Sequence, residues 1–94
     1  MLEVVMDQDG SVCLTGRFDA SQEQAALAVF NRVVANATVD FSKLEYISSA
    51  GIGVLIATQK RLMAAGCQLT LKSLSPHISE IFKYAGIDVL FKIV

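Results

Sequence analysis

Two short segments near the start of the chain have the hydrophobic pattern of β-strands. Leu2–Met6 is an apolar run with one acid, and Ser11–Thr15 alternates between polar and apolar residues. Asp7–Gly10 lies between them, and its Asp-Gly pair favours a tight turn because glycine readily adopts a positive φ. The pattern predicts an opening β-hairpin.

A helical period of apolar residues begins after this hairpin. Ser21 and Gln24 have the spacing of a capping box, which favours a helix start, and Asn36 is a plausible stop. A helix placed here puts one set of apolar residues on a single face. These are Ala26, Val29, Phe30, Val33 and Val34.

Two further helices are predicted by their caps and their period. One begins after Ser48 and Ser49 and ends at a C′ glycine, Gly66. The other begins at Ser75, followed by a proline suited to the first helical position, and ends at Gly86. Their apolar faces comprise Ile52, Leu55, Ile56, Leu62 and Met63, and then Ile78, Ile81, Phe82 and Ala85.

Three more strand candidates lie between and after these helices. They are Thr38–Phe41, Leu69–Lys72 and Val89–Val94, with Leu44–Ile47 leading from the first of them to the second helix. The order strand-strand-helix-strand-helix-strand-helix-strand predicts an α/β fold, with helices packed on a mostly parallel sheet. The length of 94 residues fits one domain, residues 1–94.

Composition excludes several classes of protein. The chain is 53% hydrophobic and 18% charged, which disfavours disorder, and its net charge of -1 disfavours binding to nucleic acid through a basic face. No apolar run reaches the roughly 20 residues of a spanning helix, and Met1–Asp9 lacks the basic start of a signal peptide. Cys13 and Cys67 have no metal spacing and are expected to be buried free thiols of a cytoplasmic protein.

A search for catalytic chemistry finds no nucleophile–base pair and no metal site. The single histidine, His77, is expected on the surface. Gly51 and Gly53 open a helix like a dinucleotide fingerprint, but the third glycine is replaced by Ile56. We therefore expect no enzyme activity, no cofactor and no metal, and assign the glycines a conformational role.

The start of the second helix is more informative. Ser48 or Ser49 is expected to cap the helix through its hydroxyl. The same position also suits a phosphate, because the N–H groups of the first turn and the positive end of the helix dipole stabilise an anion there.

The stretch from Asp40 to Leu55 closely resembles the signature of STAS domains, the family of anti-sigma-factor antagonists, which reads Asp-Ser-x-Gly-Leu-Gly-Val-Leu after an upstream acid. Three further stretches agree in order. Thr15–Asp19 is similar to the Gly-Glu-Leu-Asp element of the family, Ala65–Leu69 to its Gly-Gly-x-Leu step, and Ser75–Ile87 to its third helix and closing glycine.

The resemblance implies a STAS fold whose last, C-terminal helix is shortened or absent here. It implies a cytoplasmic bacterial regulator that works by partner switching. Unphosphorylated, such a protein binds an anti-sigma factor with serine kinase activity, and a PP2C-type phosphatase restores it after phosphorylation. The phospho-acceptor of the family falls on Ser49, with Ser48 as second choice, and the preceding Asp of the family falls on Ser48.

The expected docking surface is the start of the second helix with nearby charged residues. Asp19 is expected either to cap the first helix or to join this surface. Asp40, at the end of a short strand, is expected at the same edge, with a structural hydrogen bond as the alternative. The partner-binding residues are then Arg17, Asp19, Asp40, Ser48, Ser49, Ala50, Gly51, Ile52 and Gly53. A second hypothesis is a constitutive STAS subunit of a lipid-transport ABC complex, which the serine at position 48 leaves open.

Overall fold

The computed structural model describes residues 2–94, which form one five-stranded sheet with helices packed on it. The strands are β1 (Leu2–Met6), β2 (Val12–Phe18), β3 (Ala37–Ile47), β4 (Leu69–Lys72) and β5 (Lys92–Ile93). The α-helices are α1 (Glu23–Phe30), α2 (Ser49–Ala64) and α3 (Pro76–Tyr84), and two short 3₁₀ turns are η1 (Ala20–Gln22) and η2 (Asp88–Leu90).

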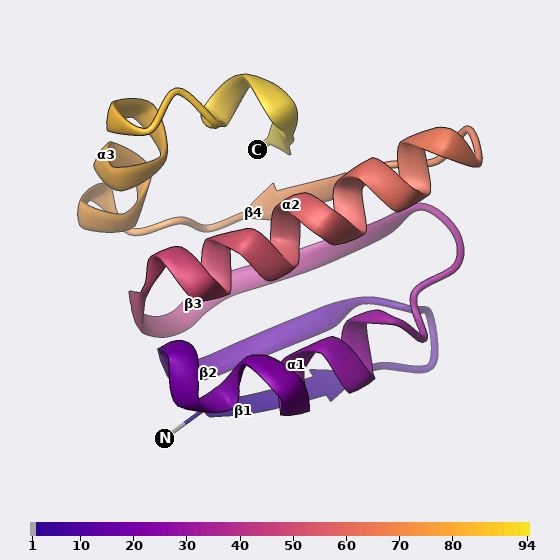
Figure 1. Cartoon of the computed structure of the whole chain (residues 1–94), viewed down its shortest axis with the longest axis horizontal. Coiled ribbons are helices and arrows are strands. Elements are labelled where there is room, and N and C mark those ends of the chain that lie inside the picture. The colour runs from indigo at the N-terminus through magenta and orange to yellow at the C-terminus, as the bar shows by residue number, and fades with distance from the viewer. Residues whose placement is uncertain (1) are drawn as a thin grey trace.

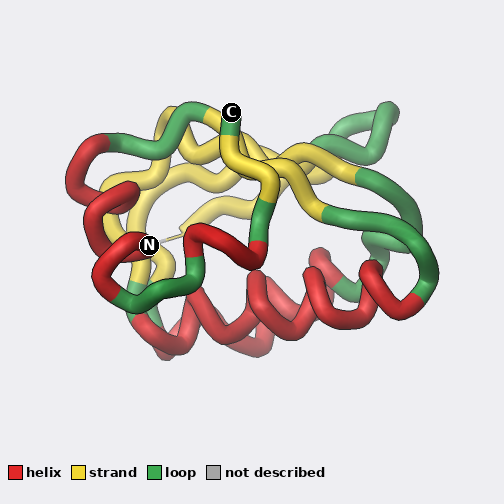
Figure 2. Tube along the Cα trace, turned by 90° about the horizontal axis from the view of Figure 1, so that it is seen from above, coloured by secondary structure: helices red, strands yellow, loops and turns green. Residues whose placement is uncertain are grey.

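The strands follow one another across the sheet in chain order. β1 and β2 form the predicted antiparallel hairpin, and each later pair of neighbours is parallel. Right-handed crossovers between successive neighbours bring the connecting helices to one face of a sheet. Figure 1 shows α1 and α2 in front of the strands, and Figure 2 shows them together on one side, with α3 near one end.

The core lies between the sheet and these helices. Phe82 of α3 meets Phe41 edge to face, with ring centroids 6.1 Å apart. Gln59 of α2 links β4 to the turn η2. The Gln59 side chain is buried, accepts a hydrogen bond from the Leu69 N–H at 2.7 Å and donates one to the Leu90 carbonyl at 2.7 Å. The fully buried large side chains are Phe18, Phe30, Phe41, Phe82, Leu14, Leu55, Leu62, Leu69, Leu71, Ile78, Val12 and Val39.

The other face of the sheet carries polar or partly exposed side chains. Cys13, Thr15 and Arg17 of β2 alternate with its buried residues and so point away from α1 and α2. Cys13 and Cys67 are both free and half-buried rather than buried as predicted. Within residues 2–94, no helix has both the length and the apolar character needed to cross a bilayer.

Three predicted boundaries are wrong. α1 ends at Phe30, so Val34 leaves the predicted helical face and is 74% exposed. The predicted strand Val89–Val94 overlaps the turn η2 and contains only two strand residues, those of β5. The predicted short strand Thr38–Phe41 is part of the 11-residue β3, which continues to Ile47.

Candidate functional site

The predicted site is built where β2 and β3 end side by side. Phe18 and Ile47 are paired in register, and the Ser48 N–H donates to the Phe18 carbonyl at 2.8 Å. This hydrogen bond fixes the point at which the chain leaves the sheet and enters α2. The carboxyl ends of parallel strands meet at one edge, which is the usual place for a binding site in open α/β sheets.

Ser48 is the residue that caps α2. Its backbone is extended, with φ −90° and ψ 172°, and its Oγ accepts from the Gly51 N–H at 3.3 Å. Its carbonyl accepts from the Ile52 N–H at 2.9 Å, which begins the helical ladder. The half-buried Ser48 hydroxyl is therefore engaged in holding the helix start, as the capping prediction required of one of the two serines.

Ser49 is the first residue of α2 and differs from Ser48 in its surroundings. Its side chain is exposed, and its hydroxyl has no hydrogen-bond partner within residues 2–94. Its position faces solvent beside the N–H groups of the first helical turn, where a negative charge is stabilised by roughly 0.3–1 kcal/mol. Of the two serines, Ser49 is the accessible one.

The two glycines of the predicted motif have different roles. Gly51 is buried, and a Cβ added there would lie 2.8 Å from Ile47 Cγ1 and 2.9 Å from Phe18 Cγ, so glycine lets α2 approach the sheet closely. Gly53 is exposed, and an added Cβ would meet nothing within 4 Å. Ser49 and Gly53 are four residues apart and share the outer face of the helix. Packing within the chain gives no reason for a glycine at 53.

Ala50 and Ile52 complete the first turns of α2. Both are half-buried, and Ile52 packs against the core. The surface that a partner can reach here consists mainly of small side chains and backbone, and it allows a close approach.

Asp19 caps η1 rather than pointing freely to solvent. Its carboxylate accepts hydrogen bonds from the backbone N–H and the hydroxyl of Ser21, and its own N–H donates to Gln22 Oε1 at 3.0 Å. The Ser21 hydroxyl is the main cause of the lowered pKa of Asp19, followed by the Ser21 backbone N–H. The capping box is thus Asp19 with Gln22, and the predicted box of Ser21 with Gln24 is wrong. η1 contacts α2, so Asp19 stands at the same edge as Ser48.

Asp40 does not belong to this site. It lies within β3, opposite Cys13 of β2 and Lys72 of β4, and most of the strand separates it from Ser48, roughly 26 Å at ~3.3 Å per residue. Its carboxylate accepts from the Ser42 N–H at 2.9 Å, the main cause of its lowered pKa. The structural alternative is correct for Asp40, and its predicted place at the docking edge is wrong.

Arg17 lies beside the site on the outer face of the sheet. Its guanidinium carbon is 4.4 Å from the centroid of the Tyr46 ring. This cation–π contact joins the C-terminal ends of β2 and β3. The sequence pattern singled out Arg17 but gave no sign of its contact with Tyr46, because the pairing depends on the register between two strands distant in sequence.

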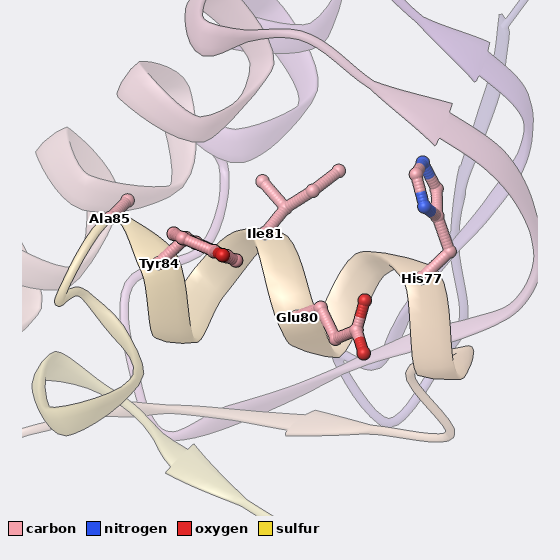
Figure 3. Close-up of a pocket in the computed structure, with 5 residues that line it drawn as sticks. All are labelled: His77, Glu80, Ile81, Tyr84 and Ala85. Atoms are coloured by element: carbon pink, nitrogen blue, oxygen red, sulfur yellow. The ribbon is translucent and has the colours of Figure 1, made fainter.

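One hollow of the surface lies away from this site. Figure 3 shows it along α3, where it has a volume of about 540 Å³ and no lining residue from β2, β3 or α2. Tyr84 is 95% exposed there, and His77 is exposed as expected. The lining residues are His77, Glu80, Ile81, Tyr84 and Ala85. Among residues 2–94, no three His, Cys, Asp or Glu side chains are grouped to hold a metal ion.

Comparison with known proteins gives the same family for most of the chain. The family model described as "Mlab, STAS domain" matches residues 4–94. A protein of Bordetella bronchiseptica named "Putative anti-sigma factor antagonist BtrV" is 32% identical, over 98% of this chain and 85% of its own length.

Solved structures share the fold. The anti-sigma factor antagonist SpoIIAA in its unphosphorylated form has a TM-score of 0.77 at 18% identity and covers 100% of this chain and 88% of its own. The Bacillus cell fate determinant SpoIIAA in the phosphorylated form has a TM-score of 0.72 at 18% identity, over 100% of this chain and 91% of its own. The opening hairpin and the parallel strands with their helices are thus those of a known fold. The family model and the relative from Bordetella show that the chain belongs to the STAS-domain family.

Proposed function

We propose that this chain is an anti-sigma factor antagonist of the bacterial cytoplasm that acts as a binding module. The relative from Bordetella, which carries that description, supports the role. The docking surface in this proposal is the start of α2 with the adjoining end of β2. Its residues are Arg17, Asp19, Ser48, Ser49, Ala50, Gly51, Ile52 and Gly53.

Ser49 is the switch in this proposal, and its exposed hydroxyl at the first position of α2 is the observation that carries it. Phosphorylation adds about −1.5 to −2 charges at a place that the helix N-terminus tolerates, so the fold persists. At a closely packed interface the same charge costs desolvation and repels acidic neighbours. Phosphorylation therefore releases the partner without unfolding the protein.

The partners of such a switch are two enzymes. The anti-sigma factor, with serine kinase activity, binds the unphosphorylated protein and then transfers phosphate to Ser49. A PP2C-type phosphatase removes the phosphate and restores binding. The shared fold with SpoIIAA, solved in phosphorylated and unphosphorylated forms, supports the compatibility of this architecture with such a cycle.

Titration calorimetry with the anti-sigma factor from the same cell tests this function. Ser49→Ala is expected to keep the affinity of the wild type, and Ser49→Asp is expected to weaken it by a factor of ten or more, since each 1.4 kcal/mol is about tenfold. Ser42→Asp is the matched control, because it adds the same charge at an exposed position of β3 outside the docking surface, and it is expected to keep the affinity of the wild type. Equal affinities for Ser49→Ala and Ser49→Asp would exclude Ser49 as the switch.

A second candidate function is a constitutive STAS subunit of a lipid-transport ABC complex. Ser48 favours it, because the acid that precedes the phospho-acceptor in the family signature is absent from this chain. The same docking surface would then hold a nucleotide-binding subunit permanently. Affinity purification from the native cell separates the two functions: transporter subunits without an anti-sigma factor would favour the second.

A further inference from the structure

The ends of β2 and β3 contain an irregularity that changes which side chains meet. Gly16 is paired with Leu44, but the next residue, Arg17, is paired with Tyr46, so Glu45 is the extra residue of a β-bulge. Gly16, across from the bulge, has φ +97°, a conformation that glycine adopts without strain. Bulges re-aim the side chains that follow them.

The bulge decides the partner of Arg17. In an unshifted register Arg17 would lie beside Glu45, an acid, on the neighbouring parallel strand. The shift gives Arg17 the Tyr46 ring instead, at 4.4 Å, and places Ile47 opposite Phe18 in the core. Because of the bulge, the neighbour of Arg17 on β3 is the aromatic ring of Tyr46 and not the carboxylate of Glu45.

The positive charge of Arg17 is left without a carboxylate. Arg17 is exposed, and the acid nearest to it in sequence is Asp19. The carboxylate of Asp19 is hydrogen-bonded to Ser21, and the charge of Arg17 is the smallest of the causes that lower its pKa. Within residues 2–94 no carboxylate forms an ion pair with this guanidinium. Its donors are therefore free for a group outside the chain, and stacking on Tyr46 already orients the guanidinium plane.

Arg17 also lies within reach of any partner that covers Ser49. The residue after it, Phe18, accepts the hydrogen bond from the Ser48 N–H that fixes the start of α2. A protein interface of ordinary size buries about 800 Å² on each side, a patch roughly 30 Å across. Arg17 and Tyr46 lie on the outer face of the sheet at the end of β2 and β3 where α2 begins, so a partner that covers this end of the sheet can contact both them and Ser49.

On the basis of the proposed function, we propose that the Arg17–Tyr46 pair determines partner specificity by binding a carboxylate side chain of the anti-sigma factor. A guanidinium matches a carboxylate with two parallel hydrogen bonds, and an oriented guanidinium loses less entropy when it forms them. A positive charge at this contact also rejects partners whose own charge is basic there.

The test is a double-mutant cycle between this chain and the anti-sigma factor that co-purifies with it from its own cell, produced separately for calorimetry. Arg17→Glu is expected to weaken binding about 100-fold, because like charges at an interface cost several kcal/mol. Tyr46→Leu, which removes the platform but keeps the charge, is expected to weaken it about fivefold. Lysine replacement of the contacting acid of the partner is expected to restore binding to Arg17→Glu and to no other variant.

Arg32→Glu is the matched control. Arg32 is exposed and lies beside Asp9 and Gly10, at the other edge of the sheet, and its replacement changes the net charge equally. It is expected to leave the affinity within about twofold of the wild type. Arg17→Lys keeps the charge but cannot form two parallel hydrogen bonds with a carboxylate, and it is expected to bind about tenfold more weakly than the wild type. This variant keeps the test valid if the Arg17→Glu protein does not fold.

Equal affinities for Arg17→Glu and Arg32→Glu would overturn the assignment while leaving the proposed function intact. Loss of binding to vesicles of anionic lipid in Arg17→Glu, with unchanged affinity for the anti-sigma factor, would overturn it in favour of a lipid phosphate. If the wild-type chain binds no anti-sigma factor, the proposed function itself fails and this inference falls with it.

Discussion

Two glycines in the first turns of α2 are expected to respond in opposite directions to replacement by alanine. Alanine is favoured over glycine inside a helix by roughly 0.5–1 kcal/mol. At Gly53 the added Cβ meets nothing within 4 Å, so Gly53→Ala should gain that amount. At Gly51 it would lie 2.8 Å from Ile47 Cγ1 and 2.9 Å from Phe18 Cγ, and overpacking costs about 1–3 kcal/mol. Gly51→Ala should therefore lose about 0.5–2 kcal/mol net.

Urea unfolding followed by circular dichroism measures both changes by linear extrapolation. The expected order of unfolding free energy is Gly53→Ala, then wild type, then Gly51→Ala. In calorimetry Gly53→Ala, although more stable, should bind the anti-sigma factor more weakly, because its methyl group stands on the docking surface. A Gly51→Ala protein as stable as the wild type would refute the close packing of α2 on the sheet. Unchanged binding by Gly53→Ala would remove that residue from the docking surface.

Three further predictions concern stability. Ser48→Ala should lower the unfolding free energy by about 1 kcal/mol in urea unfolding, since it removes the α2 cap, and a Ser48→Asp protein that is equally destabilised would contradict the capping role. Gln59→Leu should cost about 2–4 kcal/mol in the same assay, because the Leu69 N–H and the Leu90 carbonyl lose their partner; a loss under about 1 kcal/mol would show that these groups find others. The lowered pKa of Asp19 means that its carboxylate stabilises the fold above its unfolded pKa, near 4, and that this contribution disappears as the pH falls through its folded value. Thermal unfolding at pH 3 and pH 7 should therefore show a smaller pH dependence for Asp19→Asn than for the wild type, and identical pH dependence would contradict it.

The helix starts were predictable from sequence because caps are local. Ser48 and Ser75 accept hydrogen bonds from N–H groups three residues on, as their sequence context indicates. The first helix shows the limit of this reasoning. Asp19 with Gln22 and Ser21 with Gln24 both offer a polar residue followed by a glutamine, and the choice between them depends on the η1 turn that precedes α1.

β3 could not be predicted in full because its register is not regular. Its buried residues Val39, Phe41, Leu44 and Ile47 do not keep the spacing of two that defines a strand in sequence. Two register shifts against β2 account for the change of spacing. The alternation of buried and exposed residues that predicts a strand therefore ends at the first bulge, near Phe41. Because the predicted strand ends there, Asp40 is wrongly expected at the carboxyl end of β3.

Phosphopeptide mass spectrometry of the protein purified from its own cell, in growth and under stress, tests the central claim most directly. Phosphate is expected on Ser49, whose hydroxyl is exposed and unpaired within residues 2–94, and none is expected on Ser48, whose hydroxyl caps α2. Repeated absence of phosphate from both serines, or phosphate on Ser48 alone, would contradict the account.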